Sequence, residues 1–210
     1  MHQFGDSMKT ENVTWTLSKI PREQRWAGLS QKGAVIWLTG LSGAGKSTIA
    51  VGVEHWLYQR GRHCFVLDGD NLRHGLCGDL GFSEVDRLEN VRRAGEAAKL
   101  MAESGLIAIC ALISPFAAER NRLRAICAAD SIPFAEVFIS TPLELCEQRD
   151  VKGLYKRARM GELKMFTGID SPYEPPETPD LVIQTGKITI VEGIGLLGGH
   201  IHDLTMLSPH

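Results

Sequence analysis

The sequence predicts an α/β protein built on a parallel β-sheet with helices on both faces. Short apolar runs alternate with longer amphipathic segments along most of the 210 residues, which is the pattern of strands joined by crossover helices. The run at 106–113 is almost continuously apolar, as strands buried on both faces are. A glycine-rich segment at 40–47 separates the first apolar run from the helix that follows it. In such sheets ligands bind at the carboxyl ends of the strands.

The glycine-rich segment reads Gly-Leu-Ser-Gly-Ala-Gly-Lys-Ser and matches G-x-x-x-x-G-K-[ST] in full. In this motif backbone N–H groups surround an anion, Lys46 adds positive charge for the β- and γ-phosphates, and the Ser47 hydroxyl ligates Mg²⁺. A glycine-rich turn without a ligand is the alternative. The full match between a strand and a helix favours a nucleoside-triphosphate site and the P-loop NTPase fold. The residues expected to bind ATP are Gly40, Leu41, Ser42, Gly43, Ala44, Gly45, Lys46, Ser47 and Thr48.

Capping and turn residues mark the other elements in chain order. Ser83 precedes a helix whose first turn is acidic and which Gly105 ends, and Pro142 starts a shorter helix that ends near Arg149. The expected strands are 34–39, 64–67, 106–113, 134–139 and 181–184, and the expected helices follow 47 and span 83–104, 117–129 and 142–149.

Three segments depart from the alternation. Residues 150–179 are rich in Lys, Arg, Gly and Pro and are longer than a connector needs, so we expect a mobile lid. The polar residues 1–11 are expected to be disordered. Residues 188–210 carry four glycines between 190 and 199, each of which costs about 1 kcal/mol in a helix, so a weakly structured tail is expected. The remaining residues, 12–187, are expected to form one P-loop domain.

Composition excludes several classes of function. The net charge of −2 and the pI near 6.4 show no basic footprint for nucleic acid, and no apolar run is long enough for a membrane span. The N-terminus lacks the apolar core of a signal peptide. The five cysteines are widely spaced and indicate free thiols in a cytoplasmic protein, with Cys77 the one expected to be reactive.

Two carboxylates, Asp68 and Asp70, flank Gly69 directly after the strand at 64–67. Phosphoryl transfer needs an acid that helps to hold Mg²⁺ and a carboxylate that positions or deprotonates the acceptor hydroxyl. An Asp-Gly turn without chemistry is the alternative, but the P-loop on the same sheet edge favours the functional reading. Two carboxylates separated by one glycine could divide that work between them.

Arginines concentrate in the next segment. Arg73 and Arg87 stand beside Phe82 and Asn90, and guanidinium groups suit a multi-oxygen anion such as sulfate or phosphate. Taken singly, such arginines are more often solvated or paired with acids. Arg92 or Arg93 is the one expected to be structural. The segment as a whole predicts an anion-binding surface, with Phe82 available to stack on a base.

Several motifs, in order and with compatible spacing, resemble the adenylylsulfate kinase (APS kinase) family. Besides 40–48 they are Asp68-Gly-Asp-Asn-Leu-Arg73, Asp79-Leu-Gly-Phe-Ser83 with Asp86-Arg-Leu-Glu-Asn90, Arg149-Asp-Val-Lys-Gly-Leu-Tyr155 and Phe166-Thr-Gly-Ile-Asp170. The resemblance covers about 12–184. It implies transfer of the ATP γ-phosphoryl group to the 3′-hydroxyl of adenosine 5′-phosphosulfate (APS), giving PAPS and ADP in sulfate assimilation. It also implies a homodimer.

The resemblance assigns roles to residues at matching positions. It implies that Asp70 orients the 3′-hydroxyl of APS, with Asp68 nearer Mg²⁺ or in support of the P-loop. Arg149 is expected to lie against the ATP adenine, and Lys152 to close over the phosphates as part of the lid. Ser114 occupies the position described in bacterial members as a phosphoserine intermediate. Because no base stands next to it, a substrate-contact role is favoured. The residues expected to bind APS are Asp70, Arg73, Phe82, Arg87, Asn90, Ile113, Ser114, Lys152 and Phe166, and the catalytic set is Lys46, Asp70, Ser114 and Lys152.

Three features depart from the family pattern, and two other functions stay open. Cys77 stands where the family commonly has Asn, Phe116 stands where it often has a basic or polar residue, and the glycines of 190–199 replace an amphipathic terminal helix. A nucleoside or sugar kinase would share the P-loop, although the arginines and the motif at 166–170 argue against it. A non-catalytic nucleotide switch would keep the P-loop, but the intact Asp68, Asp70 and Lys152 argue for catalysis.

Overall fold

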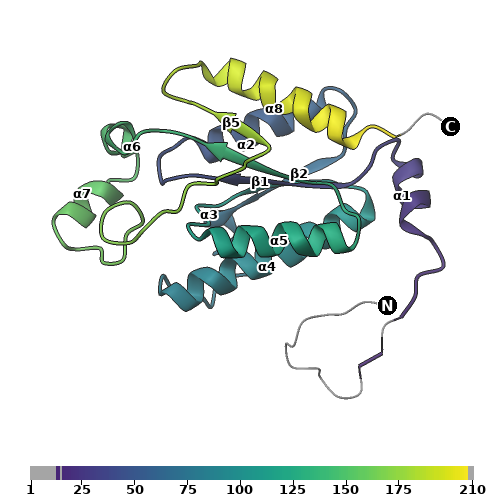
Figure 1. The fold of residues 1–210 in the computed structure, drawn as a ribbon, viewed down its shortest axis with the longest axis horizontal. Coiled ribbons are helices and arrows are strands. Elements are labelled where there is room, and N and C mark those ends of the chain that lie inside the picture. The colour runs from purple at the N-terminus through teal and green to yellow at the C-terminus, as the bar shows by residue number, and fades with distance from the viewer. Residues whose placement is uncertain (1–12, 15, 208–210) are drawn as a thin grey trace.

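Five parallel strands form the sheet at the centre of the molecule (Figure 1). The computed structural model describes residues 13–14 and 16–207. The strand order is β2-β3-β1-β4-β5, and every neighbouring pair is parallel, which confirms the expected α/β fold. The strands are β1 (Ala34–Thr39), β2 (Cys64–Asp68), β3 (Ile107–Ala111), β4 (Phe134–Ile139) and β5 (Leu181–Ile183).

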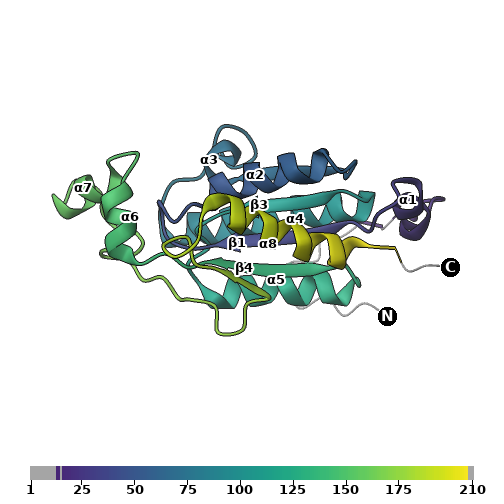
Figure 2. The ribbon, with the colours of Figure 1, turned by 90° about the horizontal axis from the view of Figure 1, so that it is seen from above.

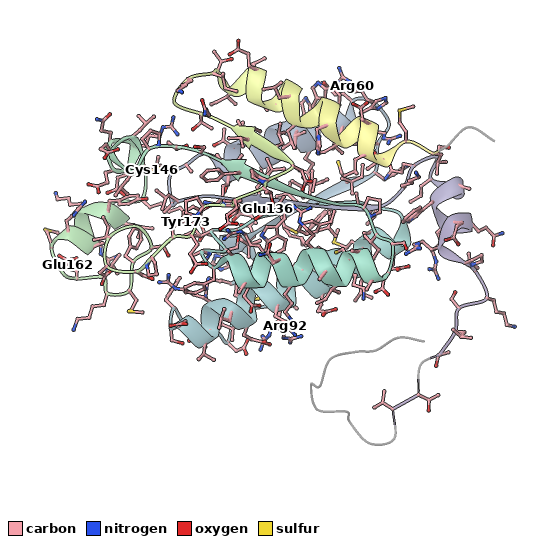
Figure 3. The ribbon with its side chains drawn as sticks, viewed as in Figure 1. Arg60, Arg92, Glu136, Cys146, Glu162 and Tyr173 are labelled. Atoms are coloured by element: carbon pink, nitrogen blue, oxygen red, sulfur yellow. The ribbon has the colours of Figure 1, made fainter. Side chains whose placement is uncertain are left out.

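Helices cover both faces of this sheet, as the two views at right angles show (Figures 1 and 2). The helices α4 (Glu84–Ser104) and α5 (Ala117–Ala129) lie on one face, where Val35 and Trp37 of β1 are buried against them. Glu136 of β4 (Figure 3) is also on this face. Arg120 of α5 donates to it there.

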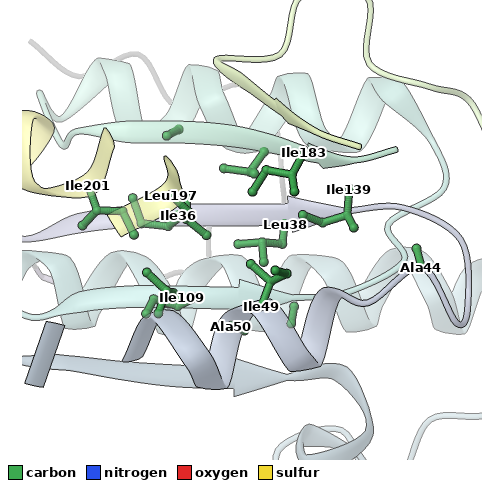
Figure 4. Packing of buried hydrophobic residues seen from close by; sticks show 14 of the residues in the cluster. Ile36, Leu38, Ala44, Ile49, Ala50, Ile109, Ile139, Ile183, Leu197 and Ile201 are labelled. Atoms are coloured by element: carbon green, nitrogen blue, oxygen red, sulfur yellow. The ribbon is translucent and has the colours of Figure 1, made fainter. Parts of the chain in front are cut away.

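The opposite face packs against α2 (Lys46–Tyr58) and α8 (Ile190–Thr205). Ile36 and Leu38, the alternate residues of β1, meet Ile49 of α2 and Leu197 of α8 in one apolar cluster (Figure 4). Since successive side chains of a strand point to opposite faces, the wholly buried β1, which is apolar from Ala34 to Leu38, supplies both halves of the core.

The shorter helices lie at the two ends of the sheet. The helix α1 (Arg22–Gly28) packs on α4, where the Trp26 indole donates to the Ala102 carbonyl at 2.9 Å. The helices α3 (Gly69–Leu72), α6 (Leu143–Arg149) and α7 (Leu154–Arg159) lie at the carboxyl ends of the strands. Figure 1 shows α6 and α7 at the opposite end of the molecule from α1.

The C-terminal prediction was wrong, because 190–205 form a regular helix and not a weakly structured tail. Thr189 and Glu192 form a reciprocal capping box at its start. Two of its glycines are there for close packing: a Cβ on Gly198 would lie 2.7 Å from the Trp56 ring, and one on Gly193 would lie 3.0 Å from Ile49. Tertiary burial therefore outweighs the low helix propensity of glycine here.

Two remaining predictions concern the N-terminal residues and the absence of a membrane span. The predicted disorder of 1–11 concerns residues outside those that the structure describes. Within 13–14 and 16–207, no helix combines the length and the apolar character that a membrane span requires.

Candidate active site

The P-loop connects β1 to α2, and its lysine folds back over it. Gly45 is the N-cap of α2 with φ +106°, a backbone conformation that favours glycine. The Lys46 ammonium donates to the Gly40 carbonyl at 2.9 Å and to the Leu41 carbonyl at 2.8 Å. Burial lowers the pKa of Lys46 to about 8, although the thiol of Cys146 and the nearby carboxylates act in the opposite direction.

The far side of the loop is held by a cluster of donors around the Ala44 carbonyl. Thr141 Oγ1 donates to it at 2.9 Å, Thr185 Oγ1 at 3.0 Å and the Arg149 guanidinium at 3.3 Å. Arg149 also donates to the Thr185 carbonyl at 3.0 Å. Arg149 was expected at the nucleotide site and lies against this loop. The two threonines, which follow β4 and β5, were not predicted.

A lid residue makes a second contact with the loop that the sequence did not reveal. The Tyr155 hydroxyl, from α7, donates to the Ser42 carbonyl at 2.9 Å. The Tyr155 ring also meets the Phe166 ring edge-on, with centroids 5.0 Å apart and planes at 80°. Tyr155 thus joins the P-loop to the second half of the segment 150–179.

The two aspartates after β2 have different surroundings. Asp68 Oδ2 accepts from the Ser47 hydroxyl at 2.6 Å, and Asp68 Oδ1 caps α3 by accepting from the Asp70 N–H at 2.9 Å. Asp70 turns outward, where its carboxylate forms an ion pair with Lys152. The structure therefore places Ser47 beside Asp68, the two residues predicted at the metal, and Asp70 beside Lys152, a pairing that was not predicted.

Arg73 and Phe82 form one corner of the predicted acceptor surface. The Arg73 guanidinium lies over the Phe82 ring, 4.2 Å from its centroid, and donates to the Gly81 carbonyl at 2.8 Å. The Phe82 ring is 66% exposed. An exposed aromatic face backed by a guanidinium is available to a planar ligand.

Arg87 connects this corner to the lid. Its Nε donates to the Phe82 carbonyl at 2.9 Å, and its terminal nitrogens donate to the Thr167 hydroxyl at 2.7 Å and to the Met165 carbonyl. The latter two contacts lie on either side of Phe166 in the chain. Arg87 thereby ties the segments that carry the two predicted stacking aromatics, Phe82 and Phe166. A hollow of ≈ 500 Å³ lies nearby, lined by Leu41 and 168–173.

Asn90 and Cys77, two residues behind this surface, are buried. Asn90 is 5% exposed and lies beside Cys77. The expectation of a reactive Cys77 was wrong, because the residue is fully buried and burial raises the pKa of its thiol.

Ser114 lies in a constrained turn after β3. Its φ is +40°, unusual for a residue with a side chain, and it is 3% exposed. Its hydroxyl accepts from the Trp37 indole N–H at 3.0 Å. The preceding Ile113 is half-buried, and its carbonyl accepts from the Thr39 hydroxyl at 2.7 Å. No basic side chain among these contacts could activate Ser114 as a nucleophile.

The remaining arginines of the segment, Arg92 and Arg93, both pair with acidic side chains, whereas the sequence predicted a structural role for one of them. Arg92 forms an ion pair with Glu89 at 2.6 Å on the outer side of α4 (Figure 3). Arg93 pairs with Asp79 at 2.6 Å and with Glu89 at 2.8 Å. The hydrogen bonds from Arg92 and then Arg93 lower the pKa of Glu89 to about 2.

Comparison with known proteins agrees with this geometry. The family model described as adenylylsulphate kinase matches residues 32–184. An adenylyl-sulfate kinase of Vibrio vulnificus is 51% identical over 206 residues, covering 97% of each chain. One of Marinobacter nauticus is 50% identical over 197 residues, covering 94% of this chain and 98% of the relative. The solved structure of a Mycobacterium tuberculosis APS kinase in complex with AMPPNP and APS superposes with a TM-score of 0.76 at 48% identity, covering 82% and 97% of the two chains.

Proposed function

This chain belongs to the adenylylsulphate kinase family and is an ATP-dependent kinase, and on that premise we propose how its residues divide the reaction. The reaction is transfer of the ATP γ-phosphoryl group to the 3′-hydroxyl of APS, giving PAPS and ADP. The observation that carries the proposal is the pairing of Ser47 with Asp68 and of Asp70 with Lys152, side by side at the mouth of the P-loop.

The ATP half of the site is Gly40–Thr48 together with Arg149. The N–H groups of the loop and the N-terminus of α2 would surround the phosphates. Lys46 would leave the Gly40 and Leu41 carbonyls for the phosphate oxygens, whose negative charge favours the protonated ammonium. The position of Arg149 behind Ala44 supports its contact with the nucleotide.

Ser47 and Asp68 are the proposed Mg²⁺ ligands. Their oxygens, 2.6 Å apart, are the hard donors that Mg²⁺ prefers, and Mg²⁺ in kinases binds one or two protein oxygens besides the substrate phosphates. Bound Mg²⁺ would neutralise charge on the phosphates during transfer.

The APS half is formed by the surface between α3, α4 and the lid. Phe82 and Phe166 offer aromatic faces to the adenine, and the guanidinium groups of Arg73 and Arg87 suit the phosphosulfate. The remaining proposed contacts are Asp70, Asn90, Ile113, Ser114 and Lys152.

Asp70 is the proposed group that orients and accepts a proton from the 3′-hydroxyl. It is exposed, whereas Asp68 is occupied by Ser47 and by the cap of α3. Lys152 would stabilise charge on the transferring group as the segment 150–179 closes and excludes water. Direct in-line transfer needs no covalent intermediate, and the buried hydroxyl of Ser114 supports a pocket role for that residue.

Two further proposals concern the whole protein. All five cysteines are free thiols, which supports work in the reducing cytoplasm. A homodimer is proposed from the family resemblance, and light scattering of the purified protein at several concentrations tests it.

The decisive experiment measures PAPS formation from APS and ATP, with and without Mg²⁺, as APS is varied. A panel of nucleosides and sugars tests the alternative acceptors. PAPS formed only with APS, ATP and Mg²⁺ supports the proposal. Turnover of a sugar or nucleoside alone would replace it, and ATP binding without turnover of any acceptor would indicate a nucleotide switch.

A further inference from the structure

Arg120 of α5 is a buried charge that the proposed reaction does not use. It is 1% exposed, and its Nε donates to Glu136 Oε1 of β4 at 2.6 Å. A buried ion pair satisfies both charges, but this pairing employs only one edge of the guanidinium. The other nitrogens bind backbone carbonyls from two separate loops, Ser114 at 2.6 Å and Glu174 at 2.6 Å.

The first of these loops is the turn that ends in the proposed acceptor pocket. Ser114 has a left-handed φ of +40°, a conformation that persists only where its surroundings hold it. The Arg120 contact to the Ser114 carbonyl and the Thr39 contact to the Ile113 carbonyl fix the two peptide groups of the turn.

The second loop is the base of the lid, where the chain returns to β5. The Glu174 N–H donates to the Pro115 carbonyl at 2.9 Å, and the Glu174 carboxylate accepts from the Ala117 N–H at 2.7 Å. The Tyr173 hydroxyl lies 3.1 Å from Thr39 Oγ1. Figure 3 shows Tyr173 beside Glu136 in the middle of the molecule. The base of the lid is thus fastened to the turn after β3.

This base connects directly to the lid residues that face the acceptor. The turn 166–171 is closed by the Gly168 N–H to the Ser171 carbonyl at 2.8 Å and by the Ser171 N–H to the Phe166 carbonyl at 3.2 Å. Displacement of Tyr173 and Glu174 would therefore displace Phe166 as well. The P-loop follows β1, and Thr141 and Thr185, which come after β4 and β5, donate to its Ala44 carbonyl. None of the hydrogen bonds described above joins Arg120 to the P-loop.

We propose that Arg120 is a positioning residue for the acceptor half of the site. Its planar guanidinium group binds the Ser114 carbonyl and the Glu174 carbonyl at the same time. It thereby fixes the distance between the Ser114 turn and the base of the lid, which form two walls of the proposed acceptor pocket. The inference rests on the proposed function for the identity of the acceptor. It predicts that loss of this guanidinium group affects APS and leaves ATP unaffected.

The test compares Arg120→Lys with Arg124→Lys. Lysine at 120 keeps a positive charge beside Glu136 but cannot reach three acceptors in fixed directions. Arg124 is the matched control, because it binds Glu136 Oε2 at 3.5 Å and Asp180 at 2.7 Å and makes no hydrogen bond to Ser114 or Glu174. Wild type and both variants are assayed for KM of APS, KM of ATP, kcat, melting temperature and the rate of trypsin cleavage within 150–170.

Arg120→Lys is expected to raise KM for APS about tenfold or more, to leave KM for ATP within about twofold, and to speed cleavage of the lid. Arg124→Lys is expected to change neither KM. Equal changes in both KM values, or a lower melting temperature with unchanged KM for APS, would show a purely structural role and overturn the proposal.

If Arg120→Lys fails to fold, Glu174→Ala at an exposed position tests the connection between the lid base and the turn after β3. This substitution removes the carboxylate that accepts from the Ala117 N–H. A selective rise in KM for APS supports the connection, and unchanged kinetics reject it. Failure of the proposed function can be distinguished from failure of this inference. In the first case wild type would form no PAPS, but the trypsin cleavage rates of the two arginine variants could still be compared.

Discussion

Lys152 of the lid forms an ion pair with Asp70 at the start of α3, on the opposite side of the P-loop mouth. The two side chains are 61% and 66% exposed, so solvent screens the pair and it adds little to folding stability. A weak pair of this kind separates easily. In the proposed reaction, this separation would let Asp70 face the acceptor hydroxyl and Lys152 face a phosphate.

Replacement of Asp70 by Asn should abolish most turnover. The amide keeps the shape but accepts no proton, so kcat is expected to fall by about a hundredfold or more. The melting temperature should stay unchanged, because the pair is exposed. Asp79→Asn is the control, since Asp79 is an equally exposed acid that pairs with Arg93 outside the site. Steady-state kinetics that leave kcat of the Asp70 variant within twofold of wild type would disprove the assignment.

The affinity for ATP should depend on pH through Lys46. Its pKa of about 8 in the free protein means that the ammonium loses its proton above that pH, and with it the charge that attracts phosphate. The dissociation constant of an ATP analogue should rise about tenfold between pH 7 and pH 9. Phosphate binding favours the charged form, so binding near pH 8.5 should take up a proton.

Titration calorimetry in two buffers of different ionisation enthalpy measures that uptake. Lys46→Met is the control and should bind weakly with no such dependence. A wild-type dissociation constant that is flat across this range would mean that Lys46 stays charged throughout.

Removal of the Thr185 hydroxyl should weaken the support of the P-loop. Thr185→Val keeps the shape but loses the donor to the Ala44 carbonyl and the acceptor for Arg149. KM for ATP is expected to rise about fivefold, which corresponds to about one hydrogen bond, with KM for APS unchanged. Thr189→Val removes the capping box of α8 instead, and should lower the melting temperature without a change in either KM.

Two glycines of α8 should respond oppositely to alanine. Gly198→Ala would place a methyl group 2.7 Å from the Trp56 ring, and is expected to destabilise the protein by about 1–3 kcal/mol. Gly195→Ala meets no atom within 4 Å and should stabilise it by up to about 1 kcal/mol. Denaturant unfolding of both variants measures the difference. Destabilisation by Gly195→Ala would contradict the assigned packing role, because the two positions would then behave alike.

The sheet and the main helices were predictable because their signals are local. The runs at 34–39 and 134–139 coincide with β1 and β4, and the capping serine at 83 marks the start of α4. The C-terminal helix was not predictable in this way. Its glycines lower local propensity, and the reason for them, the closeness of Trp56 and Ile49, exists only after folding.

The residues of the site also divide into those with a local signal in the sequence and those without one. Motif residues such as Lys46 and Asp68 could be predicted because their spacing is typical of the chemistry. Thr185 and Arg120 were missed, since a single threonine or arginine in an ordinary segment forms no pattern. Their partners, Ala44 and Glu174, lie 141 and 54 residues away in the sequence.

The strand order β2-β3-β1-β4-β5 has a consequence for how such an enzyme can diverge. The turns after β2 and β3 carry Asp70 and Ser114, whereas those after β4 and β5 carry Thr141 and Thr185 behind the P-loop. The central strand β1 therefore separates Asp70 and Ser114 from the threonines that support the P-loop, but the segment 150–179, which follows β4, crosses to the other side and brings Lys152 to Asp70. A descendant with a different phosphate acceptor would therefore need matched changes on both flanks of β1.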